Sequence, residues 1–216
     1  LATSQRFDDE CERSLVLDEA RTYYANILMP LGGPTGKALG SAAKRDIRMI
    51  APSHGVIWRT HIPEIISAYQ RWTAGRVEPR VLIFYDTMWE STAQMAESIY
   101  EGVVNDGVEA RLHHIRLTGL TRIAAEALEA AAIAVGSPTL NSGPMPMVAA
   151  AMTYLQGLKP VNKTALAFGS AGWAKGGADA VQSYFEALKW NILRDPIRAQ
   201  YRSEEHTSEL QSRQSI

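Results

Sequence analysis

The strongest pattern in this 216-residue chain is the alternation of short apolar runs with longer amphipathic segments after residue 80. Residues 81–85 form an unbroken apolar run, which is typical of a strand covered on both faces. Apolar residues then recur at three- and four-residue spacing, which predicts a helix over residues 92–105. The same order continues through predicted segments at residues 109–117, 123–129, 131–136, 147–158, 164–168, 178–188 and 191–199. Strands that alternate with helices in this way predict an α/β fold with a doubly wound parallel sheet.

The first third of the chain has a less regular pattern. It predicts, in order, helix over residues 18–24 and 26–29, a break near Pro30, a turn at residues 31–34, a strand at residues 47–51 and a helix at residues 63–72. Residues 74–79 are rich in turn-forming residues and therefore mark the best boundary. We expect two parts on either side of it, residues 1–76 and residues 77–201.

The composition changes after residue 201. Residues 202–216 resemble the translation of a sequencing adapter, so we expect a non-native tail and leave it out of the fold prediction. A helix should follow the last strand of such a sheet, and we expect that helix to be lacking here. Part of one face of the sheet would then be less well covered, which should lower the stability of the fold.

The turn after the first buried strand has the residues of a phosphate site. Thr87, Ser91 and Thr92 offer hydroxyl donors, and the start of the next helix offers unpaired N–H groups and a partial positive charge. The turn contains no Lys or Arg, and Asp86 and Glu90 would repel a polyphosphate. These features favour a single phosphomonoester, such as the phosphate of FMN, over a nucleoside triphosphate.

Two later predicted strands also end in small polar loops. Ligands of open parallel sheets bind beside the carboxyl ends of strands, so we expect the three loops to hold one flat ligand. Trp89 and Trp173 lie where a planar ring needs an apolar wall, although either could instead pack in the core or cap a loop. Trp58, Trp72 and Trp190 have no such position, and we interpret them as packing residues. The candidate cofactor-binding residues are Thr87, Met88, Trp89, Glu90, Ser91, Thr92, Pro138, Thr139, Leu140, Asn141, Ser170, Ala171, Gly172 and Trp173.

Taken together, the three loops resemble those of the flavodoxin-like FMN domain, and more closely those of the flavodiiron proteins, or A-type flavoproteins. Residues 1–76 resemble the C-terminal portion of a metallo-β-lactamase-like αββα domain, so the implied fold is this portion followed by a flavodoxin-like doubly wound sheet. The resemblance implies reduction of oxygen or nitric oxide at a diiron centre. FMN would pass electrons to it from a rubredoxin-like donor or a reductase. Head-to-tail homodimers of this family bring the FMN of one subunit near the irons of the other.

The resemblance also implies one metal ligand. His54 lies in a turn where the histidine of this family ligates iron; the alternative is a structural histidine that only forms hydrogen bonds. The histidine- and carboxylate-rich motif that should supply the other ligands is absent from the sequence, and one histidine cannot hold two irons. His113 and His114 are neighbours in a predicted strand and face opposite ways, so they cannot chelate one metal. We therefore expect a flavin-binding fragment with an incomplete diiron site.

Two further classes of function stay open. One is a stand-alone electron carrier of the flavodoxin type, and the other is an inert fragment that binds nothing. The first 76 residues argue against the plain carrier, which would have no use for them.

Composition and net charge limit the partners and the cellular compartment that we expect for the protein. A net charge of −1 gives no general attraction to nucleic acid or to an anionic membrane. The sequence has no run of about 18 apolar residues and no signal-peptide pattern, so we expect neither a membrane span nor secretion. The single cysteine, Cys11, cannot form an internal disulfide, which suits a reducing cytoplasm.

Overall fold

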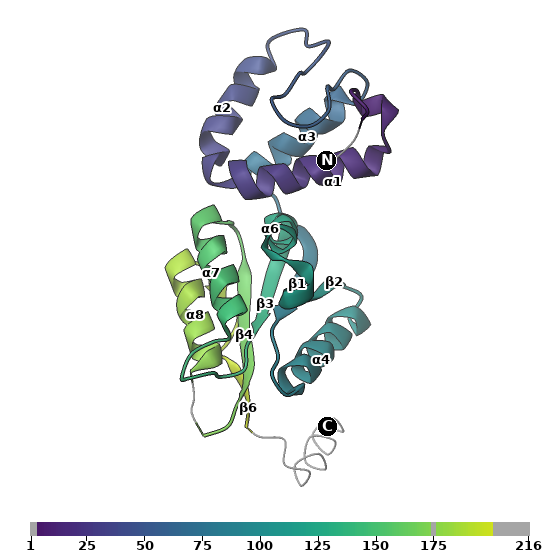
Figure 1. Ribbon diagram of the computed structural model, residues 1–216. Helices are drawn as coiled ribbons and strands as arrows, with labels where there is room; N and C mark the ends of the chain where they lie inside the picture. Colours follow the sequence, from purple (N-terminus) through teal and green to yellow (C-terminus); the bar gives the residue numbers. More distant parts are fainter. Residues whose placement is uncertain (1–3, 174–175, 201–216) are drawn as a thin grey trace.

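The computed structural model describes residues 4–173 and 176–200, and the predicted tail at residues 202–216 lies outside the described residues. A helical N-terminal part is stacked on a three-layer part, in which helices cover both faces of a sheet (Figure 1). The turn-rich segment predicted as a boundary lies between α3 (Ile62–Thr73) and the main length of β1 (Glu78–Tyr85).

The sheet is parallel at every pairing of its described strands. Its strands are β1 (Glu78–Tyr85), β2 (Glu109–His114), β3 (Ala130–Gly136), β4 (Thr164–Ala171), β5 (Asn191–Ile192) and β6 (Ile197–Gln200). They follow the order β2-β1-β3-β4-β5, and β6 also pairs with β4. The predicted last strand, residues 191–199, is thus two short strands along the same edge of β4. The prediction of a doubly wound parallel sheet is confirmed.

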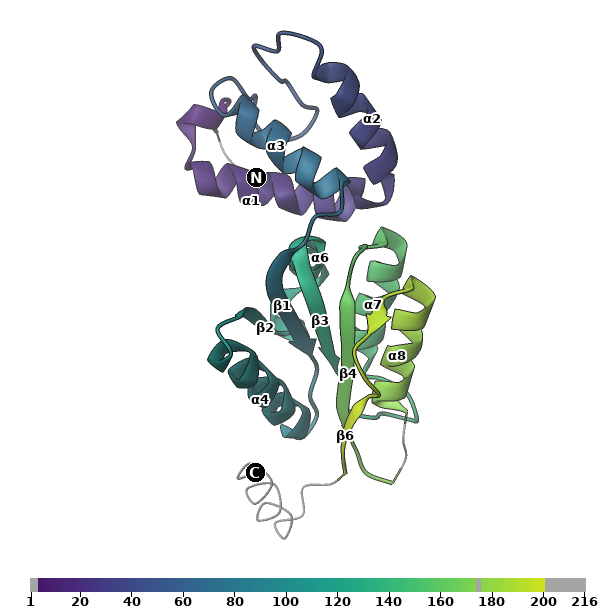
Figure 2. The same ribbon diagram turned by 180° about the vertical axis from the view of Figure 1, so that it is seen from behind.

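Helices cover both faces of this sheet (Figures 1 and 2). On one face lies α4 (Ser91–Asn105), whose apolar residues meet Ile83, Ala134 and Phe168. The other face is covered by α6 (Leu120–Glu129), α7 (Pro146–Leu158) and α8 (Gly177–Leu188). Each central strand therefore points alternate side chains into two separate cores.

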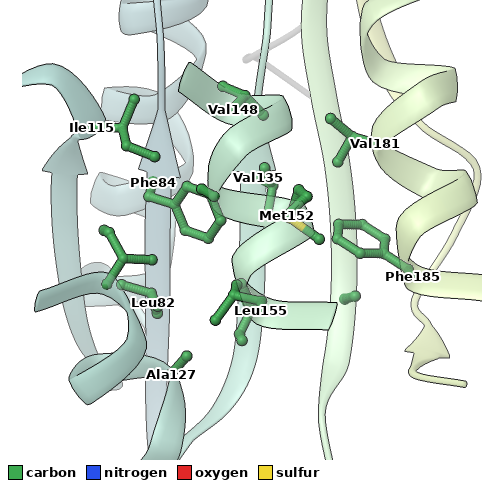
Figure 3. Packing of buried hydrophobic residues seen from close by; sticks show 14 of the residues in the cluster. Leu82, Phe84, Ile115, Ala127, Val135, Val148, Met152, Leu155, Val181 and Phe185 are labelled. Atoms are coloured by element: carbon green, nitrogen blue, oxygen red, sulfur yellow. The ribbon is translucent and has the colours of Figure 1, made fainter. Parts of the chain in front are cut away.

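The alternation explains the unbroken apolar run in β1. Leu82 and Phe84 enter the core beneath α6, α7 and α8, whereas Ile83 enters the core beneath α4. Figure 3 shows the larger core, with Leu82, Phe84, Ile115, Ala127, Val135, Val148, Met152, Leu155, Val181 and Phe185 labelled. Since both faces are buried, no position in the middle of the strand is free to be polar.

The N-terminal part is mostly helical. It contains η1 (Asp8–Glu10), α1 (Arg13–Tyr23), η2 (Tyr24–Leu28), η3 (Met29–Leu31), α2 (Gly32–Ala42) and α3. A shared core joins it to the sheet part, because Tyr24 and Trp72 pack against Ala125 and Leu128 of α6. Within this interface the Trp72 Nε1–H donates to Glu129 Oε1 at 2.8 Å. The two parts are therefore held together by both apolar and polar contacts.

Several predicted elements were wrong. The helix predicted from residue 18 begins at Arg13, and helical turns continue through Pro30 instead of breaking there. Residues 31–34 are no turn: Leu31 ends η3 and residues 32–34 begin α2. Pro34 is tolerated there because an N–H in the first helical turn would have no helical acceptor. Residues 47–51 form no strand; Ile50 only exchanges two hydrogen bonds of 2.9 Å with Trp58. The strand predicted over residues 109–117 ends at His114, since α5 (Ile115–Thr118) turns off the sheet and buries Ile115 in the core.

A buried lysine joins α6 to β3. Lys163 Nζ donates to the carbonyl oxygens of Leu128 at 3.1 Å and Ala130 at 2.6 Å. Burial lowers the pKa of this ammonium from 10.5 to about 7, although the nearby Glu129 carboxylate acts in the opposite direction. Near neutral pH, the folded protein therefore holds a proton at Lys163 less tightly than the unfolded chain does.

This difference predicts a pH dependence of stability. Between about pH 7 and 10 the unfolded chain binds more protons than the folded protein, so the free energy of unfolding should rise with pH. The Lys163→Met variant should lose this rise, whereas Lys37→Met, at an exposed position of α2, should keep it. Urea unfolding at pH 7, 8 and 9 measures the slope. An equal slope in wild-type protein and Lys163→Met would contradict the expectation.

Candidate functional site

The carboxyl ends of β1, β3 and β4 form the edge of the sheet farthest from the N-terminal helices (Figure 2). From this edge β1 leads to α4 on one face, and β3 leads to α7 on the other. Open α/β sheets bind ligands at strand ends where the connections diverge to opposite faces in this way. All three predicted loops lie at this edge.

The loop after β1 is fixed by backbone hydrogen bonds. The Asp86 N–H donates to Gly136 O at 3.1 Å, which ties the end of β1 to the end of β3. Glu90 takes a left-handed conformation with φ of 63° immediately before α4, a geometry that is strained for any residue but glycine. The Ser91 N–H donates to Trp89 O at 2.8 Å, but no side chain caps the start of α4, so the N–H groups that follow Ser91 are available to an anion.

Two threonine hydroxyls face this helix start. Thr92 is fully buried, and its Oγ1 lies 2.9 Å from Ser170 Oγ, which links the loops after β1 and β4. Thr87 Oγ1 is buried and has no hydrogen-bond partner among the described residues. An unsatisfied buried hydroxyl is destabilising by about 1–3 kcal/mol, so this atom fits a ligand that carries an acceptor. A phosphate oxygen is such an acceptor.

The loops after β3 and β4 pack backbone against backbone. A Cβ atom on Gly169 would lie 1.9 Å from Ser137 O, so only glycine allows this close approach. The Ser137 N–H donates to Phe168 O at 3.0 Å, and the Thr139 N–H donates to Ser170 O at 2.9 Å. These contacts place the two loops side by side.

The predicted residues of the loop after β3 differ in how far the protein itself engages them. Thr139 Oγ1 accepts a hydrogen bond of 3.0 Å from the Gly177 N–H, so this hydroxyl supports the start of α8. Leu140 and Gly143 exchange two hydrogen bonds of 2.9 Å around a tight turn. Asn141 lies in that turn with φ of 48°, and Leu140 packs against the core. The backbone of this loop is thus held firmly, while its outer side stays open.

Both predicted ring-wall tryptophans are highly exposed. Trp89 is 82% exposed and Trp173 is 90% exposed, so neither packs in the core. They come from the loops after β1 and β4, respectively. Trp58, Trp72 and Trp190 are buried, as predicted. The two exposed indoles offer apolar surface at the same edge as the hydroxyls, which suits a flat aromatic ligand.

A group of ionisable residues beside the loop after β1 was not recognised from the sequence. Asp86, interpreted only as a repulsive charge, is fully buried and pairs with Arg116 at 2.8 Å and His114 at 3.4 Å. The signal was an acidic residue placed directly after a buried strand. His114 ends the adjacent strand β2 and Arg116 follows it, and their proximity to Asp86 depends on a strand register that the sequence does not show.

His54 lies apart from this edge, in the N-terminal part. Its imidazole is exposed, its ring centroid lies 5.6 Å from that of Tyr23, and it borders a mainly apolar cavity of about 500 Å³. Within residues 4–173 and 176–200, no three His, Cys, Asp or Glu residues are grouped so that they could hold a metal ion. The described residues therefore do not fit a diiron centre, and the assignment of His54 as a metal ligand stays a prediction.

None of the described helices is both long enough and apolar enough to span a membrane.

Comparison with known proteins gives the family. The Flavodoxin family model matches residues 83–213. Nitric oxide reductase of Moorella thermoacetica is 41% identical over 198 residues, which are 91% of this chain and 50% of that protein. Anaerobic nitric oxide reductase flavorubredoxin of Pectobacterium atrosepticum is 35% identical over 183 residues, which are 82% of this chain and 36% of that protein.

Solved structures give the same result. Rubredoxin oxygen:oxidoreductase of Desulfovibrio gigas superposes with a TM-score of 0.90 at 30% identity, covering 98% of this chain and 54% of that one. The flavodiiron protein of Giardia intestinalis gives a TM-score of 0.86 at 32% identity, covering 96% and 52%. The chain spans about half the length, or less, of the curated relatives it matches. It belongs to the flavodoxin family, in the form that is found in flavodiiron proteins.

Proposed function

We propose that the chain binds FMN at the carboxyl edge of its sheet and serves as the flavin-binding, electron-transferring part of an oxygen or nitric oxide reductase. The observation that carries this proposal is the unpartnered, buried Thr87 hydroxyl beside the uncapped start of α4. A phosphate would satisfy both at once. Membership of the flavodoxin family supports FMN as the molecule that brings the phosphate.

Each loop has a separate task in this proposal. Thr87, Thr92 and the first N–H groups of α4 hold the phosphate, and the turn offers it neutral donors rather than lysine or arginine. Trp89 and Trp173 cover the ring and exclude water from its faces. The remaining predicted contacts come from Met88, Glu90, Ser91, Pro138, Thr139, Leu140, Asn141, Ser170, Ala171 and Gly172. When bound, FMN accepts electrons in pairs and releases them singly.

The wider assignment concerns the whole protein. Relatives named nitric oxide reductase and rubredoxin-oxygen oxidoreductase support a reductase that receives electrons from a rubredoxin-like donor or another reductase. In this proposal residues 1–76 are the end of a metallo-β-lactamase-like domain and residues 77–201 are the flavin domain. His54 is one iron ligand, and the irons need further ligands from outside the described residues. A head-to-tail homodimer would place flavin and irons of different subunits together.

A stand-alone flavodoxin-type carrier is the second candidate. The interface between the two parts argues against it, because Trp72 and Tyr24 are buried against α6 and Trp72 is hydrogen-bonded to Glu129. A carrier that needed only its sheet part would have no reason to maintain these contacts. The third possibility, an inert fragment, is decided by flavin uptake.

Flavin uptake is the first test. Purified protein, incubated with FMN if necessary, should become yellow with flavin absorption in the visible, and denaturation should release FMN rather than FAD. The reason is that the edge offers one phosphate site and no cationic residue in its turn for a second phosphate. Absorption spectroscopy and chromatography of the released flavin measure this. A colourless protein that takes up no FMN would favour the inert fragment.

Removal of two hydroxyls tests the phosphate site. Thr87→Ala combined with Thr92→Ala should weaken FMN by roughly 3–6 kcal/mol, because two hydrogen bonds to a charged group are lost. Riboflavin, which lacks the phosphate, should bind almost unchanged. Ser98→Ala, at an exposed position of the same helix, is the matched control. Fluorescence titration with both flavins measures the difference, and equal weakening of FMN and riboflavin would exclude phosphate binding by these hydroxyls.

Iron content tests the metal assignment. The 216-residue chain should bind added Fe(II) only weakly, because a single imidazole leaves the other coordination positions to water. His54→Ala should abolish this weak binding and leave FMN in place, whereas His61→Ala should change neither. Equilibrium dialysis against Fe(II), followed by mass spectrometry of the metal and absorption spectroscopy of the flavin, measures both. Two tightly held irons per chain would contradict the expectation, as would unchanged iron binding in His54→Ala.

A further inference from the structure

The phosphate turn begins with a buried carboxylate. Asp86 is fully buried, and its Oδ1 accepts a hydrogen bond of 2.8 Å from the N–H of Thr87. Thr87 is the residue whose hydroxyl lacks a partner. A negative charge therefore lies one residue from the place where the proposed function puts a phosphate. Like charges at such a short range, away from water, repel strongly.

One cation compensates this charge. Arg116 Nε lies 2.8 Å from Asp86 Oδ1 and 3.1 Å from Oδ2, so it contacts both carboxylate oxygens. His114 Nε2 lies 3.4 Å from Oδ1, and its ring stacks on Tyr85 with centroids 5.3 Å apart. Among the described residues, Arg116 is the only permanently charged cation within ion-pair distance of Asp86. Its guanidinium thus decides the net charge behind the turn.

The strand register places this cation. Tyr85 pairs with His114 across β1 and β2, so Asp86 and the first residues after β2 leave the sheet side by side. Arg116 lies in α5, which immediately follows β2, and its side chain is 48% exposed. The Nε edge of the guanidinium meets the carboxylate, while about half of the side chain stays exposed. Arg116 therefore acts on the turn through Asp86, which holds the Thr87 N–H.

We propose that Arg116 is a specificity-determining residue for phosphorylated flavin. It neutralises Asp86, and this neutralisation allows a phosphate to lie beside a buried carboxylate. Asp86 in turn holds the Thr87 N–H and so fixes the turn. The inference rests on the proposed function, because it takes the loops after β1, β3 and β4 as the FMN site. In addition, the preference for FMN over riboflavin depends on the Asp86–Arg116 pair, although neither side chain donates a hydrogen bond to the phosphate.

Variants that change the charge of Asp86 or Arg116 distinguish an electrostatic role of the pair from a purely structural one. Arg116→Gln should weaken FMN about tenfold or more while riboflavin stays within about twofold, because an uncompensated carboxylate repels only the phosphate. Asp86→Asn with Arg116→Gln should restore much of the FMN affinity, since neither charge remains. Asp86→Asn alone should raise the ratio of FMN to riboflavin affinity. Arg116→Lys, which keeps the charge, should leave that ratio within about threefold of wild type.

Fluorescence titration with FMN and riboflavin gives the two affinities for every variant, and thermal unfolding shows whether each is folded. The matched control is Arg48→Gln, which removes an arginine from an exposed pair with Asp46 and should change neither affinity. If Arg116→Gln does not fold, Asp86→Asn decides the question. Equal loss of both flavins in Arg116→Gln, no recovery in the double variant, or an unchanged ratio in Asp86→Asn would overturn the proposal. Wild-type protein that bound neither flavin would instead overturn the proposed function, and this inference with it.

Discussion

The burial of the central strands on both faces is the constraint on which the rest of the structure depends. Leu82 and Phe84 occupy one core and Ile83 occupies the other, so β1 can contain no polar residue along this stretch. Polar groups are therefore confined to the ends of the strands. Connections leave for opposite faces at the carboxyl edge, which is where open α/β sheets bind their ligands. The placement of the site follows from packing before any ligand is considered.

The N-terminal part contributes to this arrangement through α6. Its outer side meets Tyr24 and Trp72, and its acidic residues Glu126 and Glu129 pair with Arg21 at 3.6 and 3.3 Å. Charges buried in this way stabilise a structure only when all partners are present, so they select one relative position of the two parts. Since α6 also covers the sheet, a disturbance of this interface reaches the core behind β1 and β3.

Most of the sheet part could be predicted from the sequence because its signals are local. An apolar run of five residues, a helix with regular spacing and a hydroxyl-rich turn each lie within one segment, and these predicted β1, α4 and the connection between them. The predictions failed for features that are determined by contacts between distant parts of the chain. The ion pair of Asp86 with Arg116 depends on the register of β1 and β2, and the Thr139 hydroxyl is engaged by Gly177, almost forty positions along the chain. Residues 47–51 have a strand-like composition but only one bridging partner, Trp58. A segment forms a strand only when another strand lies beside it, and composition does not show whether one does.

The distribution of the five tryptophans has an optical consequence. Trp58, Trp72 and Trp190 are enclosed by other side chains, whereas Trp89 and Trp173 project into solvent at the carboxyl edge. Indole emission shifts to longer wavelength in water, so the two groups should contribute separate bands to the intrinsic fluorescence. Quenching of the long-wavelength band would then report events at the loops, and a shift of the short-wavelength band would report loss of the cores. The protein thus carries natural probes that distinguish occupation of its edge from unfolding, without any attached label.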